Sequence, residues 1–198
     1  MPSSDDRFQT QRRVLRPETT VEDLDAFARS RRWPMGEVTE RDRAAGTGGR
    51  VTWAAPDGAA LHYLEDAMFG IGHYVFTGRR PETLKELSAE AAQALAPWTV
   101  ADLCAAFDHA PGARERGQAA LRLGLAATAE PDRRVVERIG AVLGDGDARV
   151  RYAALWAADY TGYEVFGRTV RQIAERDPEA FVRDRATAML RARQTSTA

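Results

Sequence analysis

Apolar residues recur at helical spacing from residue 20 to about residue 33, which predicts an amphipathic helix near the start of the chain. Its apolar positions fall on one helical face, at Val21, Leu24, Phe27 and Ala28. Residues 1–19 show little periodicity of this kind. We therefore expect them to form a disordered or loosely attached arm.

The pattern changes between residues 35 and 78, where short apolar segments are separated by turn signals. Residues 50–55, 61–64 and 73–77 are typical of strands, and Pro56-Asp57-Gly58 is typical of a tight turn. These segments predict a three-stranded antiparallel meander. Residues 35–39 could add an edge strand to it.

From Pro81 onward, apolar positions again recur every three to four residues, with short breaks that contain proline or glycine. Such short connections favour antiparallel neighbouring helices. The sequence thus predicts an α+β fold, with a small α+β domain followed by an all-α domain and a frayed tail, over residues 20–97, 98–193 and 194–198. Beyond the break at residues 97–99, helices are expected up to residue 110 and over residues 113–127, 132–143, 147–158, 163–175 and 178–192.

An internal repeat runs through the second half of the chain. The pattern Val-Arg-x-x-Ala at residues 150–154 recurs at residues 182–186, 32 residues later. The Ala-Ala-Leu of residues 153–155 also occurs 34 residues earlier, at 119–121. A period in the low thirties with two helices per period is typical of a helical solenoid. Three hairpins fit it, over residues 99–128, 131–160 and 162–193.

Over residues 99–193 this repeat resembles the HEAT-repeat family in its short bacterial form. The motif is Asp147-x-x-Val150-Arg151 followed by two alanines, with a second copy that begins at Asp177-Pro178. The first unit departs from it, because Arg116-Gly117 stands where Val-Arg is expected. The resemblance implies protein–protein scaffolding in most cases, although some HEAT-like proteins are DNA glycosylases or pigment lyases. It also implies that Arg151 and Arg183 are structural residues that bond between neighbouring repeats.

Composition narrows the classes of function. The 198 residues include 28 basic and 29 acidic side chains, so a strongly basic nucleic-acid module is not indicated. The single cysteine, Cys104, excludes an internal disulfide and a cysteine zinc site. No apolar run has the length of a membrane span, and no signal peptide is visible, so we expect a cytoplasmic protein. We also expect no cofactor and no metal, since the spacing of His62 and His73 fits no metal motif.

Candidate contact residues lie opposite the apolar stripe of the helix predicted at 147–158. On that side fall Arg149, Tyr152, Trp156 and Asp159. The repeat offsets add Glu115, Gln118 and Arg122 from the first unit, and Phe181, Asp184 and Arg191 from the third. Aromatic and arginine side chains are common interface anchors, so this ridge is a candidate partner-binding surface. An equally weighted alternative is that the meander or the first helix covers Tyr152 and Trp156.

Two further segments are candidate contacts. The segment from Asp159 to Tyr163 contains two tyrosines, of which Tyr160 is included with the ridge. Glu65 and Asp66 are secondary candidates at a tip of the meander, where they would otherwise only keep a turn soluble.

The sequence shows no credible catalytic cluster, and we expect a non-catalytic adaptor or regulatory protein whose partner is another protein. One alternative is a HEAT-like glycosylase-type enzyme acting on nucleic acid, in which Trp156, Asp159 and Arg149 would bind a cationic base. Another is a small-molecule-binding accessory protein that uses the interdomain groove.

Overall fold

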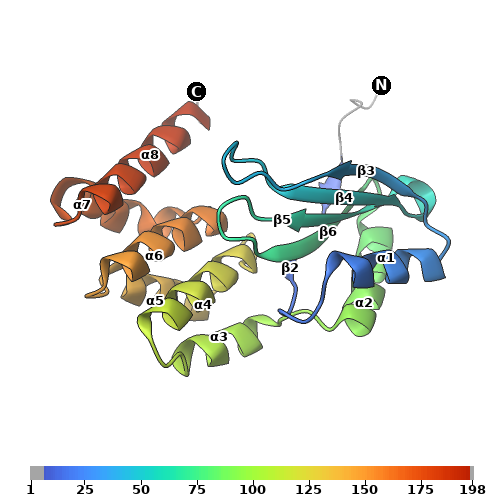
Figure 1. The fold of residues 1–198 in the computed structure, drawn as a ribbon, viewed down its shortest axis with the longest axis horizontal. Coiled ribbons are helices and arrows are strands. Elements are labelled where there is room, and N and C mark those ends of the chain that lie inside the picture. The colour runs from blue at the N-terminus through green and yellow to red at the C-terminus, as the bar shows by residue number, and fades with distance from the viewer. Residues whose placement is uncertain (1–6, 197–198) are drawn as a thin grey trace. The chain divides into compact units, whose positions relative to one another are not determined.

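The computed structural model describes residues 7–196, which divide into two compact units after Trp98 (Figure 1). This division lies within one residue of the boundary expected from the sequence. The first unit is a mixed α/β domain and the second is all helical, so the predicted α+β fold class is confirmed. Within the described residues, no helix combines the length and the apolar character needed to cross a membrane.

The first unit contains an antiparallel sheet in the order β1-β6-β5-β4-β3, with β2 also paired to β6. Strands β4, β5 and β6 form the expected meander, and β3 is its edge strand. The turn between β4 and β5 is the short 3-10 helix η1, in which Asp57 and Gly58 have φ of 56° and 72°. The strands are β1 Phe8–Gln9, β2 Arg13–Val14, β3 Met35–Thr39, β4 Gly49–Ala54, β5 Ala60–Glu65 and β6 Gly72–Gly78, and η1 spans Pro56–Gly58.

Helices α1 (Val21–Ser30) and α2 (Pro81–Leu95) belong to the same unit, and α2 packs against β6. Alternate residues of the strands point into one core together with the apolar positions of the two helices. Edge-to-face contacts join the ring of Trp33 to Phe27 at 5.5 Å and to Phe76 at 6.1 Å between centroids. The largest buried core side chains are Trp53, Tyr74, Phe76, Leu24 and Leu61.

The prediction of a loose arm over residues 1–19 is wrong for the part of it that the structure describes. Both β1 and β2 pair with β6, and Val14 and Leu15 are buried. The carbonyl of Val14 also accepts a hydrogen bond from the backbone N–H of Trp98 at 2.9 Å. Each strand has only two residues, too few to show an alternating pattern, so backbone pairing holds this segment without a sequence signal. Residues 1–6 lie outside the described range.

The second unit consists of three helical hairpins, as expected. They are α3 (Val100–Asp108) with α4 (Ala113–Leu125), α5 (Arg133–Leu143) with α6 (Ala148–Thr161), and α7 (Gly167–Arg176) with α8 (Ala180–Ser196). A 3-10 turn, η2 (Glu164–Phe166), precedes α7. Side chains of Asp132 and Asp147 cap α5 and α6 by accepting backbone N–H bonds. Since α8 continues to Ser196, the tail expected from residue 194 is helical as far as the structure describes it.

The second helices of the three hairpins, α4, α6 and α8, lie side by side in one layer (Figure 1). The approach of α4 to α6 is very close, because Gly117 faces Ala153 and Gly124 faces Ala157 across the contact. Small residues at such positions let two helix backbones meet almost directly. The layer leaves one stripe of each helix outside the core, and these stripes carry the candidate contact residues.

Candidate partner-binding surface on the helical unit

The repeat arginines have structural roles. Arg151 is buried, and it donates to both carboxylate oxygens of Asp177, at 2.6 and 2.8 Å. Its third contacts are the carbonyls of Asp145 and Gly146 in the turn before its own helix. The expectation that Arg151 bonds between neighbouring hairpins is therefore confirmed.

Arg183, by contrast, donates to the carbonyl oxygens of Asp177 and Pro178, in the turn before its own helix. The contact between hairpins that was expected for Arg183 is not seen among these bonds. In the first unit, Arg116 reaches Asp145 of the next hairpin at 3.1 Å. Although the first unit lacks the Val-Arg pair, it forms a comparable link from a different position.

Four aromatic side chains of α6 and α8 form a connected cluster on the exposed side of this layer. Tyr152 packs against Phe181 with 5.6 Å between ring centroids, and Trp156 packs against Tyr160 at 6.1 Å. The three α6 rings are half-buried, while Phe181 is 45% exposed. The sequence placed these residues on one side, and the structure brings them together.

Arg185 connects the cluster to a carboxylate. Its guanidinium carbon lies 3.5 Å from the centroid of the Trp156 ring, which is a cation–π arrangement. Its Nη2 also donates to Asp159 Oδ2 at 2.5 Å. We call Tyr152, Trp156, Asp159, Tyr160, Phe181 and Arg185 together the aromatic–arginine surface. Because Arg185 is held by two partners, the centre of this surface is fixed before any partner binds.

Arg185 was not among the residues expected from the sequence. The repeat offset of 32 to 34 residues points from the α6 ridge to Asp184 and Arg191 instead. A signal was present, since Arg185 stands four residues after Phe181 and therefore on the same helical stripe. In the structure, Asp184 and Arg191 are exposed on α8 and take no part in the cluster's ring contacts or its ion pair.

The remaining candidates flank the cluster. Gln118 on α4 and Arg149 at the start of α6 are exposed. Arg122, on the same stripe of α4 as Gln118, is half-buried, and this burial lowers the pKa of its guanidinium from the ordinary value. In the part of the chain that the structure describes, neither Arg122 nor Arg149 forms a side-chain ion pair. Two guanidinium groups thus remain available beside the aromatic rings.

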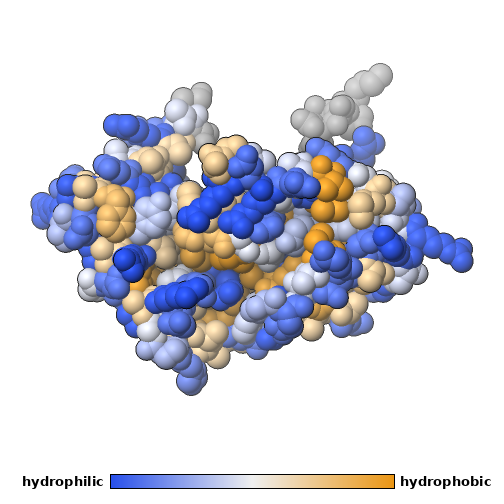
Figure 2. All heavy atoms as spheres, in the orientation of Figure 1, coloured by the Kyte–Doolittle hydropathy of each residue, from blue (hydrophilic) through white to orange (hydrophobic). Residues whose placement is uncertain are grey.

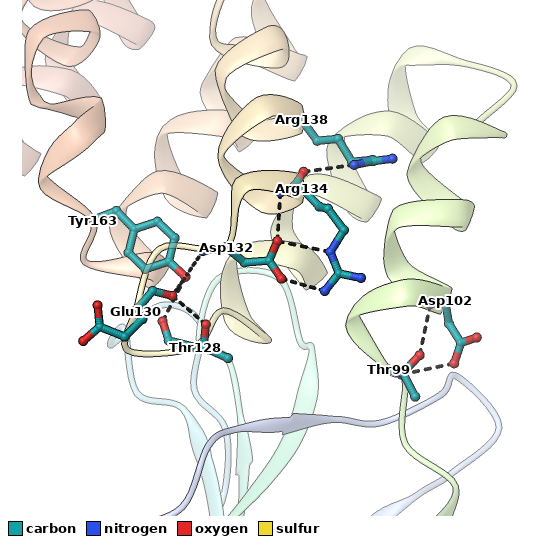
Figure 3. Close-up of polar contacts among 8 residues, drawn as sticks. All are labelled: Thr99, Asp102, Thr128, Glu130, Asp132, Arg134, Arg138 and Tyr163. Atoms are coloured by element: carbon teal, nitrogen blue, oxygen red, sulfur yellow. Dashed lines mark hydrogen bonds and ion pairs between the residues drawn. The ribbon is translucent and has the colours of Figure 1, made fainter.

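The segment after Asp159 differs from its expected form. Residues 159–161 belong to α6, and Tyr163 is only 3% exposed. The Tyr163 hydroxyl lies 2.9 and 3.0 Å from the carbonyl oxygens of Thr128 and Glu130, as Figure 3 shows. The expectation of Tyr163 as a contact residue is therefore wrong, because its ring and hydroxyl hold the α4–α5 turn. Tyr160 alone joins the aromatic–arginine surface.

Figure 3 also shows how the polar groups at this end of the unit satisfy one another. Asp132 accepts from the backbone and guanidinium of Arg134, which lowers the pKa of the Asp132 carboxyl. The side chain of Arg138 donates to the Arg134 carbonyl and also bridges to Asp108 of α3. These carboxylates already have partners, and the arrangement supports a structural role for them.

The secondary candidates Glu65 and Asp66 organise the β5–β6 hairpin. Glu65 forms an ion pair with Arg41 at 3.0 Å, and Arg41 also donates to the Ala67 carbonyl. The Asp66 carboxylate accepts the backbone N–H bonds of Met68 and Phe69. Both side chains thus shape the hairpin in which they stand.

The histidines and the cysteine occupy environments that disfavour reactive forms. His62 lies 2.8 Å from the Thr77 hydroxyl, and burial lowers its pKa. Burial also lowers the pKa of His73 to about 4 and raises that of the Cys104 thiol. A buried thiol of raised pKa is a poor nucleophile. Among residues 7–196, no group of three or more His, Cys, Asp or Glu side chains is placed to hold a metal ion.

Hydrophilic and apolar residues are interspersed over the face of the helical unit that Figure 2 presents. Comparisons with protein-family models, with curated proteins and with solved structures find no match to this chain. The function must therefore be argued from the geometry of the surface itself.

Proposed function

We propose that this protein is a non-catalytic adaptor, located in the cytoplasm, whose HEAT-like helical array binds a partner protein through the aromatic–arginine surface. The observation that carries the proposal is the ordered contact of Phe181 with Tyr152 and of Arg185 with Trp156 on adjacent helices. Aromatic and arginine residues contribute a large share of the binding energy in protein interfaces. Rings that are already packed lose little side-chain entropy on binding, which favours affinity.

The unpaired cations indicate the chemistry of the partner. Arg122 and Arg149 flank the aromatic rings without an ion-pair partner among the described residues. A half-buried guanidinium gains more from a carboxylate than an exposed one does, because water screens the pair less. We therefore expect the partner to present an apolar side chain to Phe181 and Tyr152, with an acidic group next to it.

The nucleic-acid alternative is less well supported. It requires the Trp156 ring and the Asp159 carboxylate to receive a cationic base. Arg185 already covers one face of that ring and pairs with that carboxylate. The chain therefore supplies its own cation at the position that the base would need.

The proposal can be tested with surface variants that leave the core intact. Phe181→Asp and Tyr152→Ser should each weaken binding of a captured partner by about 2 kcal/mol, or roughly thirtyfold. Val165→Asp is the matched control, since Val165 is an apolar side chain of the same unit, 58% exposed and outside the cluster. Trp156→Ala is less informative, because it also removes the ring on which Arg185 rests.

The partner should first be captured from a lysate of the native host, then purified and titrated against each variant. Equal affinity of the wild type, Phe181→Asp and Val165→Asp would exclude the aromatic–arginine surface as the binding site. Arg122→Gln should weaken binding at low salt more than at high salt, because a charge pair is screened by ions.

A further inference from the structure

A groove of about 450 Å³ lies in the first unit, between the N-terminal strand segment and helix α2. One wall comes from residues 8–11 and Arg13, which are held against the sheet by β1 and β2. The opposite wall is one face of α2, formed by Pro81, Leu84, Lys85, Ser88 and Ala89. Its volume falls in the range of small-molecule sites.

The groove has an apolar interior. Leu84 and Ser88 are buried at its base, while Phe8 is 48% exposed although it stands in a paired strand. A phenyl ring that remains half in water on a short strand loses stabilisation that a bound apolar group would restore. The α2 face from residue 81 to residue 89 extends about 12 Å, which suits an elongated ligand.

The charge of the groove has one sign. Its lining includes Arg13 and Lys85 and contains no Asp or Glu. No ion pair is formed by either cation within residues 7–196, and Arg13 Nε is buried without a hydrogen-bond partner there. The neighbouring Tyr74 hydroxyl is likewise buried without a partner. Burial raises the pKa of Tyr74, so it stays neutral and does not neutralise Arg13.

A second hollow of the same unit differs in this respect. It is about 560 Å³ in volume and lies between α1 and α2. Its lining combines Arg16 and Arg31 with Glu18 and Asp23, and Arg31 is already paired with Glu90. A mixed and paired lining of this kind does not select for one charge.

We propose that the groove between residues 8–13 and α2 is a binding site for a small amphipathic carboxylate. The apolar tail lies against Phe8 and Leu84, and the carboxylate meets Lys85 and Arg13. This site is formed by the first unit alone and is independent of the aromatic–arginine surface.

The test uses three probes with the same tail: octanoate, octanol and octylammonium. Lys85 is the only lysine of the chain, so reductive methylation with ¹³C labels this side chain and the N-terminal amine alone. In the full-length protein, octanoate should shift the Lys85 signal in a saturable manner below its micelle-forming concentration. Octylammonium should cause no saturable shift, and octanol should bind about tenfold more weakly than octanoate.

Calorimetric titrations of variants complete the test. Lys85→Gln should weaken octanoate binding about tenfold, whereas Arg43→Gln, an exposed cation outside the groove, should leave it unchanged. Ala89→Trp should abolish binding by filling the groove, and circular dichroism would verify that this variant folds. Equal binding of octanoate and octylammonium, or an unchanged affinity in Lys85→Gln, would overturn the assignment. So would the absence of octanoate binding to the wild type.

Discussion

Gly124 of α4 faces Ala157 of α6 so closely that a Cβ atom added at Gly124 would lie 2.7 Å from the Cα atom of Ala157. Real side chains do not reach such separations from backbone atoms, so α4 and α6 meet here without an intervening side chain. This contact fixes the distance between the two helices that carry Arg122 and the aromatic rings of α6.

Gly124→Ala should therefore destabilise the helical unit, because the added methyl group forces α4 and α6 apart. We expect a loss of about 2–3 kcal/mol in the free energy of unfolding, measured by urea denaturation. Gly140→Ala is the matched control, since Gly140 lies within α5 and a Cβ there would meet nothing within 4 Å. It should stabilise the unit by about 0.5–1 kcal/mol. Equal effects of the two substitutions would refute the close contact.

The bidentate pair of Arg151 and Asp177 should contribute to stability in a pH-dependent way. The Asp177 side chain is only 3% exposed, and its hydrogen bonds from Arg151 lower its pKa. Removing one partner of a buried pair leaves the other charge uncompensated, so Asp177→Ala should cost about 3 kcal/mol at neutral pH. The stabilisation is present above the unfolded-state pKa of about 3.9 and is lost as pH falls through the lower folded-state value.

Urea titrations at pH 7 and at acidic pH would measure this contribution. The difference in unfolding free energy between wild type and Asp177→Ala should shrink as the pH falls below about 4. A difference that stays constant through this range would contradict an ionic origin. Glu175→Ala, an exposed carboxylate of the same unit with no ion pair in the described residues, is the control.

His73 should make the protein less stable in mild acid. Burial lowers its folded-state pKa to about 4, while the unfolded chain titrates near 6.5. As pH falls from 6.5 to 4, the unfolded state takes up a proton that the folded state does not, which costs roughly 3 kcal/mol. His73→Gln should flatten most of this dependence, and the smaller part due to His62 should persist. Parallel pH profiles of the two proteins would argue against a buried neutral His73.

Arg185 and Asp159 should be energetically coupled. Their side chains are 13% and 33% exposed, and the guanidinium also rests on Trp156. We expect Arg185→Gln to cost about 1–2 kcal/mol and a double-mutant cycle with Asp159→Asn to give a coupling of about 1 kcal/mol. The cycle is measured by thermal unfolding of the two single variants and the double variant. Strictly additive effects would mean that the pair contributes no coupling energy.

Much of the fold could be predicted from the sequence, because its elements follow the periodicity of their apolar residues. The meander, its edge strand and the three hairpins all carry such patterns. Strands β1 and β2 do not, since each has two residues and is held by backbone bonds to β6. The fate of Tyr163 was also hidden, because the sequence does not show which carbonyl groups its hydroxyl will meet.

The candidate surface could be predicted in part. The helical period placed Tyr152, Trp156 and Asp159 on one side of α6, and the structure brings them into one cluster with Tyr160. The repeat period located the third hairpin but pointed past Arg185, because α6 and α8 do not superpose residue for residue. Contacts between side chains of different helices depend on how the helices pack, and the sequence pattern alone does not contain that information.

The central claim is that the aromatic–arginine surface binds a partner protein, and site-specific photocrosslinking tests it most directly. A photoreactive phenylalanine analogue would replace Phe181 in one version of the protein and Val165 in another, each expressed in the native host. The proposal expects one partner to crosslink from position 181, and the same partner to be absent at position 165. Equal crosslinking from both positions, or none from position 181, would contradict it.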